Sequence, residues 1–426
     1  MPARHISATP GPGIKRLGLS FLVLTCTGVA VALAGHDTGE LLPLDDDAIR
    51  YTKTTADDPV ARLQQRLIAG SAKLTWEDQF GYLRSALKEL HVSPVSQVLV
   101  FSKTSFQAAR ISPRRPRAVY FNDTVTVGYV RTGDVLEFAA ADPRQGTIFY
   151  TLEQQQTARP RFYRRDVCIQ CHHSPVTQAV PGFMVRSVTP DWNGFPSGSE
   201  AFITDHRSPL KERWGGWYVT GTSGDQDHMG NAVLQRPGET RLAISGESRN
   251  ISSLRAFIEP EAYPAPHSDI VALMTLEHQS QMLNRITRLG WESRLGRPIE
   301  PLVEELVEYA LFSGEATLTA PVKGTSGFTE EFARQAPRDS KGRSLYDFDL
   351  TTRMFRYPCS FLIYSEPWDG MPALVKERVY ARLGEVLSGA DQTAKFRHLT
   401  KDDRRAIREI LQATKKGLPA TFARED

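Results

Sequence analysis

The sequence predicts an α+β fold with helices first, an antiparallel β meander next, and a mostly helical C-terminal half. Amphipathic helical patterns stand on both sides of a run of short β-branched and aromatic segments. Turn residues separate those segments, and helix start and stop signals dominate after about residue 266. Helices and strands that are grouped in this way favour α+β over an alternating α/β architecture.

The composition is that of an ordinary globular protein. The chain has 426 residues, of which 40% are hydrophobic and 24% charged, enough for two or three domains. Its four cysteines are too few for a disulfide scaffold. Arg4, Lys15 and Arg16 are the only charged residues among the first 34, so the other 49 basic residues balance the 49 acidic ones. The body of the chain therefore shows no bias towards nucleic acid or anionic lipid.

The first 34 residues have the pattern of a secretory signal peptide. Basic residues precede an apolar stretch over 17–34, and Ala32-Leu33-Ala34 supplies small residues for cleavage near Ala34. We therefore expect a periplasmic or otherwise exported protein. The alternative is an uncleaved anchor, since about 18 apolar residues are near the lower limit for a membrane span. In that case the N-terminal segment would be the membrane contact.

The region 57–155 is predicted to contain two helices and the sheet. An exposed lead-in over 35–56 comes before it. Asp57-Asp58-Pro59 predicts a helix start and a helix to about Ile68, and a second helix is expected over 75–90. Five strands are expected, at 97–102, 117–121, 125–130, 135–138 and 146–152.

The region 156–265 is rich in Gly, Pro, Trp, His and Arg and lacks a regular period, which indicates a loop-rich functional region. The region 266–426 is predicted to be mostly helical. A buried strand or core segment is expected over 357–364. Helices are expected at 271–289, 298–312, 330–335, 372–387 and 401–416.

One motif in the loop-rich region carries specific chemistry. Cys168-Ile169-Gln170-Cys171-His172 is the C-x-x-C-H pattern of c-type haem attachment. Two thiols three positions apart can form thioethers with one porphyrin, and the adjacent imidazole can then bind its iron. The motif predicts one covalent haem c, with Cys168 and Cys171 as thioethers and His172 as the proximal iron ligand. The alternatives are a disulfide, or a zinc site completed by His206 or His228.

The surroundings differ from an ordinary small helical cytochrome c domain. Strands come before the motif, and the segment 173–184 that follows it contains two prolines and leaves no room for a long helix. We therefore expect a different scaffold around a loop-rich haem site.

The sixth iron ligand has several candidates, and the position can also be open. We rank His228 first and His206 second because both lie in loops that can approach a haem face. His173 is too close to the motif in sequence, and Met184 fits a core position better. The full candidate set is His173, Met184, His206, His228, Met229 and His278.

Two further groups of residues have two interpretations each, either as contacts of the haem or as residues of the protein core. Trp214 and Trp217 can pack on the porphyrin while Arg213 or Arg207 pairs with a propionate, or they can belong to a Gly-bent core strand. On the helix 271–289, one face carries His278, Met282 and Arg285. This face is either a distal wall or part of an ordinary amphipathic helix.

Basic residues near the motif give a possible partner site. Arg114, Arg115 and Arg117, with Arg161, Arg164 and Arg165, can form a docking patch for an acidic redox partner, or they can be solvated turn residues. Phosphate-binding loops, nucleophile elbows and dinucleotide fingerprints were not found in the sequence.

The motif and four further segments resemble a group of exported bacterial proteins that contain a cytochrome c domain. The further segments are 205–209, 213–221, 228–231 and 356–360, and the resemblance extends from about Val92 to the C-terminus. It implies haem binding and electron transfer at Cys168, Cys171 and His172. We therefore expect an exported monohaem c-type cytochrome that serves a redox partner protein. The alternatives are a peroxidase-like haem oxidoreductase with an open distal site, a haem-based sensor and a structural metal-binding module.

Overall fold

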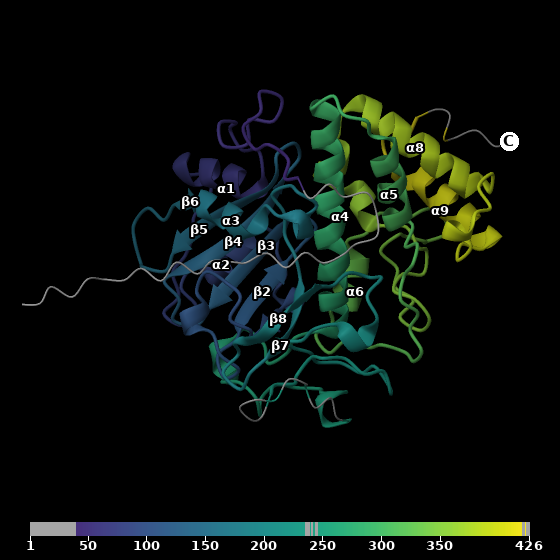
Figure 1. The fold of residues 1–426 in the computed structure, drawn as a ribbon. Coiled ribbons are helices and arrows are strands. Elements are labelled where there is room, and N and C mark those ends of the chain that lie inside the picture. The colour runs from purple at the N-terminus through teal and green to yellow at the C-terminus, as the bar shows by residue number, and fades with distance from the viewer. Residues whose placement is uncertain (1–39, 235–238, 240–241, 243–245, 420–421, 423–426) are drawn as a thin grey trace, which may run out of the picture. The chain divides into compact units, whose positions relative to one another are not determined.

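The computed structural model describes residues 40–234, 239, 242, 246–419 and 422 (Figure 1). The expected signal peptide and its cleavage site lie outside these residues, as does the start of the lead-in. None of the helices in the described part of the chain is both long enough and apolar enough to cross a membrane.

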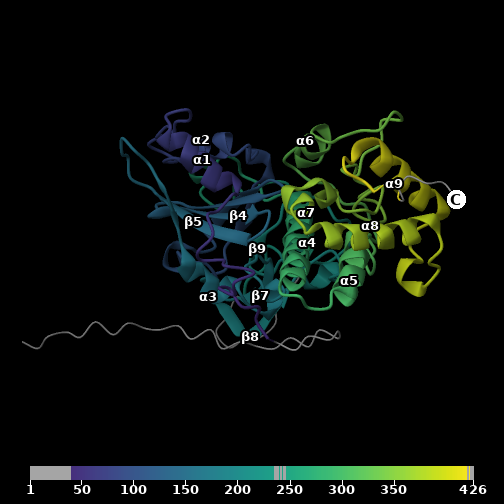
Figure 2. The same cartoon turned by 90° about the horizontal axis from the view of Figure 1, so that it is seen from above.

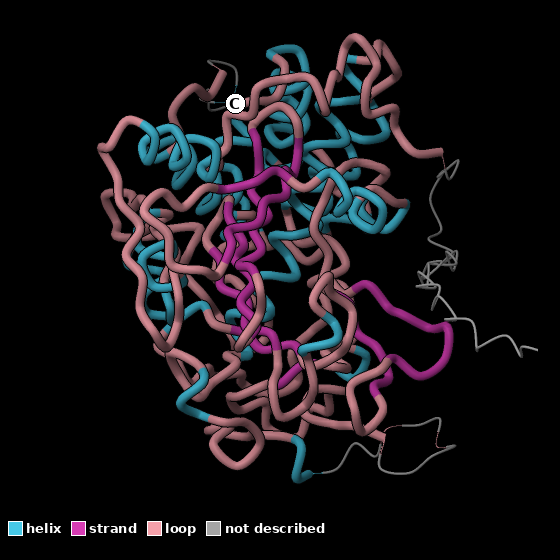
Figure 3. The backbone as a smooth tube through the Cα atoms, turned by 90° about the vertical axis from the view of Figure 1, so that its left-hand side faces the viewer, coloured by secondary structure: helices cyan, strands magenta, loops and turns pink. Residues whose placement is uncertain are grey.

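The α+β class is confirmed. A seven-stranded antiparallel sheet has the order β6-β5-β4-β3-β2-β1-β9, and β7 and β8 form a separate pair. Figure 3 shows the strands of the large sheet running together through the middle of the fold, and a separate pair of strands at one side. The strand bounds are β1 Val98–Val100, β2 Arg117–Phe121, β3 Val125–Val130, β4 Val135–Asp142, β5 Gly146–Glu153, β6 Phe162–Arg164, β7 Arg186–Pro190, β8 Pro196–Ile203 and β9 Trp217–Tyr218.

The meander β2 to β5 was predicted correctly because its signals are local. Asn122 follows β2, and its side-chain Oδ1 accepts hydrogen bonds from the backbone N–H groups of Thr124 and Val125, which closes the hairpin turn. β4 continues to Asp142, which makes a similar turn before β5. The two edge strands, β6 and β9, were not predicted.

The two faces of the sheet have different coverings. Leu136, Phe138 and Ala140 alternate along β4 and belong to the core beneath the N-terminal helices α1 (Pro59–Ile68) and α2 (Leu83–Glu89). Figure 2 shows α1 and α2 on this face and α3 (Ile169–His172), with β7 and β8, on the other. We call these the first and the second face.

The N-terminal helices differ partly from prediction. Asp58 caps α1 as expected, accepting hydrogen bonds from the N–H groups of Val60 and Ala61. α2 is shorter than the predicted 75–90, because Gly81 at φ 59° turns the chain and pairs with Glu77 before the helix begins. Most of the described lead-in residues are exposed, while Leu42, Ile49 and Tyr51 are buried and attach the segment to the core.

The helical C-terminal half packs around the long helix α4 (Ile270–Arg294), which Asp269 caps. The five predicted helices agree with observed ones to within a few residues, apart from the extension of α4 to Arg294, and the short helix at Glu366–Asp369 was not predicted. The predicted strand or core segment 357–364 is a buried 3₁₀ turn at Phe361–Tyr364. The other helices are α5 Glu300–Ala310, α6 Phe328–Arg334, α7 Glu366–Asp369, α8 Ala373–Ser388 and α9 Lys401–Thr414.

Candidate functional site

The C-x-x-C-H motif forms a short helical segment against the second face of the sheet. A 3₁₀ turn over Asp166–Cys168 leads directly into the one-turn helix α3, which contains Cys171 and His172. Residues three apart in a helical turn lie on the same side, so the two cysteines share one side of the segment. Cys168 is half-buried and Cys171 is exposed. This conformation suits two thiols that must reach the same flat molecule.

The imidazole of His172 is held by a backbone carbonyl and two aromatic rings. Its Nδ1 lies 2.9 Å from the carbonyl oxygen of Gly182, and the Gly182 N–H donates back to the His172 carbonyl at 2.8 Å. The ring centroid lies 4.7 Å from that of Phe149 on β5 and 6.2 Å from that of Phe183, which stacks on it. When Nδ1–H donates to a carbonyl, the tautomer is fixed and Nε2 keeps its lone pair for a metal.

The protonation states of the motif follow from its environment. Burial lowers the pKa of His172 to about 4, so this imidazole is neutral at pH 7, as a metal ligand must be. Burial, followed by the negative charge of Glu137, raises the pKa of Cys168 to about 11. Cys168 is therefore a protonated thiol at neutral pH.

A charged pair on the second face lies next to the motif, and the sequence analysis did not identify it. Arg117 on β2 pairs with Glu137 on β4, with 2.5 Å between the guanidinium and the carboxylate. The guanidinium crosses β3 at Gly128, where a Cβ atom would lie 2.3 Å from it. The charge of Arg117 also acts on both Cys168 and His172. A glycine in mid-strand was the available signal for this close approach.

Trp214, Trp217 and Arg213 occupy buried structural positions. The indole N–H of Trp217 on β9 donates to the carbonyl of Arg186 at 2.7 Å, and Trp214 is fully buried beside His228. Arg213 forms a buried ion pair with Glu277 on α4 at 3.2 Å. In the structure these three residues therefore lie in the protein core.

The structure brings His206 and His278 together, away from the motif. Their Nδ1 atoms are 2.9 Å apart, and the Nε2 of His278 lies 2.8 Å from the hydroxyl of Ser360. Both rings contact Tyr309 and Phe312 in the helical half. Burial lowers the pKa of His278 to about 3. The described contacts of this pair join α4 to the neighbouring segments of the helical half.

The remaining residues of the predicted distal wall and propionate sites also have partners of their own. Met282 lies in the hydrophobic core, and the Arg285 guanidinium lies 4.4 Å from the centroid of the Tyr309 ring. Arg207 pairs with Asp205 at 2.6 Å.

The other candidates for the sixth ligand are buried or held by local contacts, and the buried Nδ1 of His228 has no hydrogen-bonding partner among the described residues. The Nε2 of His173 lies 3.0 Å from the carbonyl of Ala179. His228 is 1% exposed, and burial lowers its pKa to about 4. The sulfur of Met229 accepts a hydrogen bond from Ser187, and Met184 is buried. In the described part of the chain, no group of three or more His, Cys, Asp or Glu side chains is placed to hold a metal ion.

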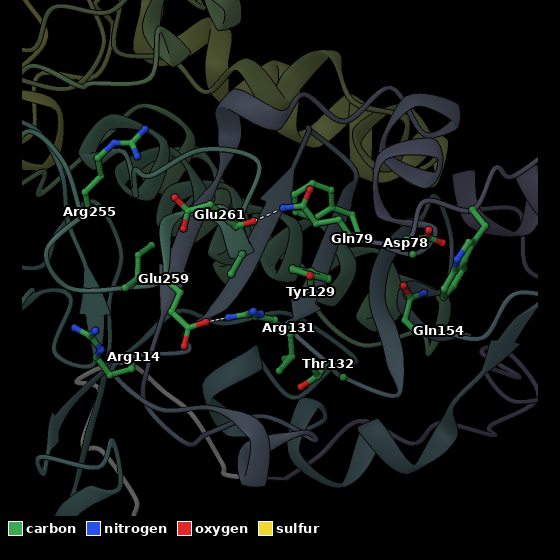
Figure 4. A pocket seen from close by; sticks show the side chains of 17 residues that line it. Asp78, Gln79, Arg114, Tyr129, Arg131, Thr132, Gln154, Arg255, Glu259 and Glu261 are labelled. Atoms are coloured by element: carbon green, nitrogen blue, oxygen red, sulfur yellow. Dashed lines mark hydrogen bonds and ion pairs between the residues drawn. The ribbon is translucent and has the colours of Figure 1, made fainter.

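The basic residues divide into two separate places. Arg114 lines a polar pocket of about 710 Å³, and Arg115 pairs with Glu259, which lines the same pocket (Figure 4). The lining includes none of the motif residues. Arg165, in contrast, donates to the side chain of Thr151 at 2.7 Å on the second face, next to the motif.

Comparisons with known proteins do not identify a relative. No family model matches the chain, and neither the curated proteins nor the solved structures contain a significant match.

Proposed function

We propose that the chain is an exported monohaem c-type cytochrome that transfers single electrons to a redox partner protein. Cys168 and Cys171 carry one covalent haem c through thioethers, and His172 is its proximal ligand. The observation that supports this most strongly is the hydrogen bond between His172 Nδ1 and the Gly182 carbonyl, which leaves Nε2 available to a metal.

The residues around the motif fit a haem group. The one-turn helix presents both thiols on one side, and burial keeps the imidazole of His172 neutral. Phe149 and Phe183 fix the ring and exclude water from its faces. A bound haem supplies reversible one-electron exchange between ferric and ferrous iron. Arg117 and Glu137 then set the charge near that iron.

A second candidate is a haem oxidoreductase with an open distal position. It is favoured by three of the four histidines considered as sixth ligands, since His173, His206 and His278 each have a hydrogen-bonding partner within the fold. His228 differs, because its buried Nδ1 has no hydrogen-bonding partner among the described residues. The ferric spectrum separates the two candidates. A six-coordinate low-spin spectrum supports an electron carrier, and a high-spin spectrum supports an enzyme.

The test is to express the full chain with a cytochrome c maturation system and record a pyridine haemochrome spectrum and an intact mass. We expect one covalent haem per chain. Cys168→Ala should lose the two-thioether product, whereas Cys359→Ala should retain it because Cys359 is buried in the helical half. Absence of covalent haem from the wild-type chain would refute the proposal. Normal attachment in Cys168→Ala would refute the assigned thioether.

A further inference from the structure

The edge strand β6 and the residues beside it form a basic surface next to the haem attachment motif. We propose that Arg161, Tyr163 and Arg165 are the docking surface for an acidic electron-transfer protein. This inference rests on the proposed function, because it identifies where electrons leave the protein and what kind of partner receives them.

Strand alternation places these three side chains on one face. β6 covers Phe162–Arg164, and Tyr163 pairs with Thr151 of β5. Phe162 belongs to the core of the first face, so its neighbours in the chain point to the second face. Arg165 confirms this direction, because its guanidinium donates to the Thr151 side chain at 2.7 Å. The surface therefore lies on the same face of the sheet as the motif.

The charge of this surface is locally concentrated. Positions 159, 161, 164 and 165 are arginines, in a chain whose body carries equal numbers of basic and acidic residues. Arg164 pairs with Asp166 at 3.1 Å and is neutralised. Arg159, Arg161 and Arg165 are exposed and form no ion pair with any described residue. Unpaired cations on one edge attract an acidic partner and set its orientation.

Exposed apolar side chains accompany these cations. Tyr163 is 46% exposed and Val167, directly before Cys168, is 50% exposed. Tyrosine and arginine are enriched at protein interfaces, where aromatic rings form the contact centre and polar groups the rim. The strand is also at the sheet edge, where the outward N–H of Phe162 donates to the Gln64 side chain at 2.7 Å, so side chains and not the strand backbone make up this surface. The surface thus has the composition of a protein interface.

The experiment measures oxidation of the ferrous holoprotein by stopped-flow, at low and high ionic strength. The oxidants are ferricyanide, tris(phenanthroline)cobalt(III) and an acidic plastocyanin. The test variant is Arg161→Glu/Arg165→Glu. The control is Arg378→Glu/Lys401→Glu, which changes the net charge equally at exposed positions of α8 and α9. Haem content and circular dichroism are checked in each variant.

At low ionic strength, we expect the plastocyanin rate constant of the test variant to fall about tenfold and its salt dependence to flatten. Ferricyanide should react more slowly and the cobalt complex faster, while the control should stay within about twofold of the wild type. Tyr163→Ala should slow plastocyanin but leave ferricyanide unchanged, because only a protein docks on the ring.

Three different outcomes would contradict the docking surface, the kind of partner and the proposed function, respectively. Equal rates for the test variant and the control, with haem intact, would overturn the docking surface and leave the cytochrome assignment standing. A variant that keeps its plastocyanin rate but loses binding to anionic phospholipid vesicles would replace the protein partner with a membrane. A wild-type chain without covalent haem would refute the proposed function itself.

Discussion

Protonation of His278 should make the stability of this protein strongly dependent on pH. The ring is fully buried, with His206 on its Nδ1 and Ser360 on its Nε2, and burial lowers its pKa to about 3. A histidine in the unfolded chain has a pKa of about 6.5. As the pH falls below that value, the unfolded chain binds a proton that the folded chain does not. The contribution of His278 to the free energy of unfolding is therefore present above pH 6.5 and is lost on acidification.

The size of this loss can be calculated from the two pKa values. Each pH unit between them costs about 1.4 kcal/mol, so moving from pH 6.5 to pH 5.0 costs about 2 kcal/mol. The loss continues down to about pH 3, where the folded protein also becomes protonated. Buried carboxyl groups act in the opposite direction, because burial raises the pKa of Glu277 to about 7. The pH dependence of the wild type alone therefore does not isolate His278, and a variant is required.

The variant His278→Gln removes the titrating group while keeping a polar side chain. At pH 7.5 we expect it to be about 1 to 3 kcal/mol less stable in urea unfolding followed by tryptophan fluorescence, because a buried hydrogen-bonding partner is lost. At pH 5.0 this deficit should shrink by about 2 kcal/mol. Gln156→Asn is the control at an exposed position without a titrating group, and its difference from wild type should be the same at both pH values. A deficit of equal size at both pH values for His278→Gln would refute the buried, neutral state of this histidine.

Three other substitutions test the packing that supports the site, each by urea unfolding against the wild type. Arg213→Ala should cost about 1 to 3 kcal/mol, because it removes the ion pair with Glu277 and leaves the buried carbonyl groups of His206 and Ser208 without their donor, and wild-type stability would contradict these buried contacts. Gly215→Ala should cost about 1 to 3 kcal/mol, since its Cβ would lie 2.0 Å from the carbonyl oxygen of Val188, and wild-type stability would contradict that close approach. Asp58→Ala should cost about 1 to 3 kcal/mol through loss of the α1 cap and of the buried hydrogen bond from the Tyr150 hydroxyl, and wild-type stability would contradict both contacts.

The sequence predicted those parts of the fold whose signals are contained in a few neighbouring residues. The hairpin turn at Asn122 and the helix start at Asp58 each depend on a side chain that bonds to backbone groups two or three positions away. The strands on either side of Asn122 and the helix after Asp58 were accordingly predicted at the correct places. The edge strands were missed because β9 is two residues long and pairs with β1, more than a hundred residues earlier in the chain.

The candidate site also combines a motif made of neighbouring residues with contacts between residues that are distant in the sequence. The spacing of Cys168, Cys171 and His172 is a local pattern, so the hypothesis of covalent haem needs only five neighbouring residues. The bond from His172 to Gly182 depends on how a ten-residue loop closes, which no periodicity encodes. The candidates for the sixth ligand were selected only by residue type. Their burial, as for His278 in the helical half, depends on contacts that are distant in the sequence.

The alternation along the central strands explains why the motif lies where it does. On the first face, β4 presents Leu136, Phe138 and Ala140 to a hydrophobic core, whereas on the second face it presents Glu137 and Ala139. Glu137 is paired with Gly128 of β3, so the small and polar residues of this face continue from β4 onto β3. Near Gly128 and Ala139 the second face therefore offers little large apolar area for a long helix to bury, whereas at β1 and β2 the same face carries Val119 and Phe121 and shares a core with α4. The short segment with the two thiols and the imidazole lies beside the small and polar part. A glycine and a glutamate in mid-strand therefore indicate where a short polar segment, and not a long helix, covers the sheet.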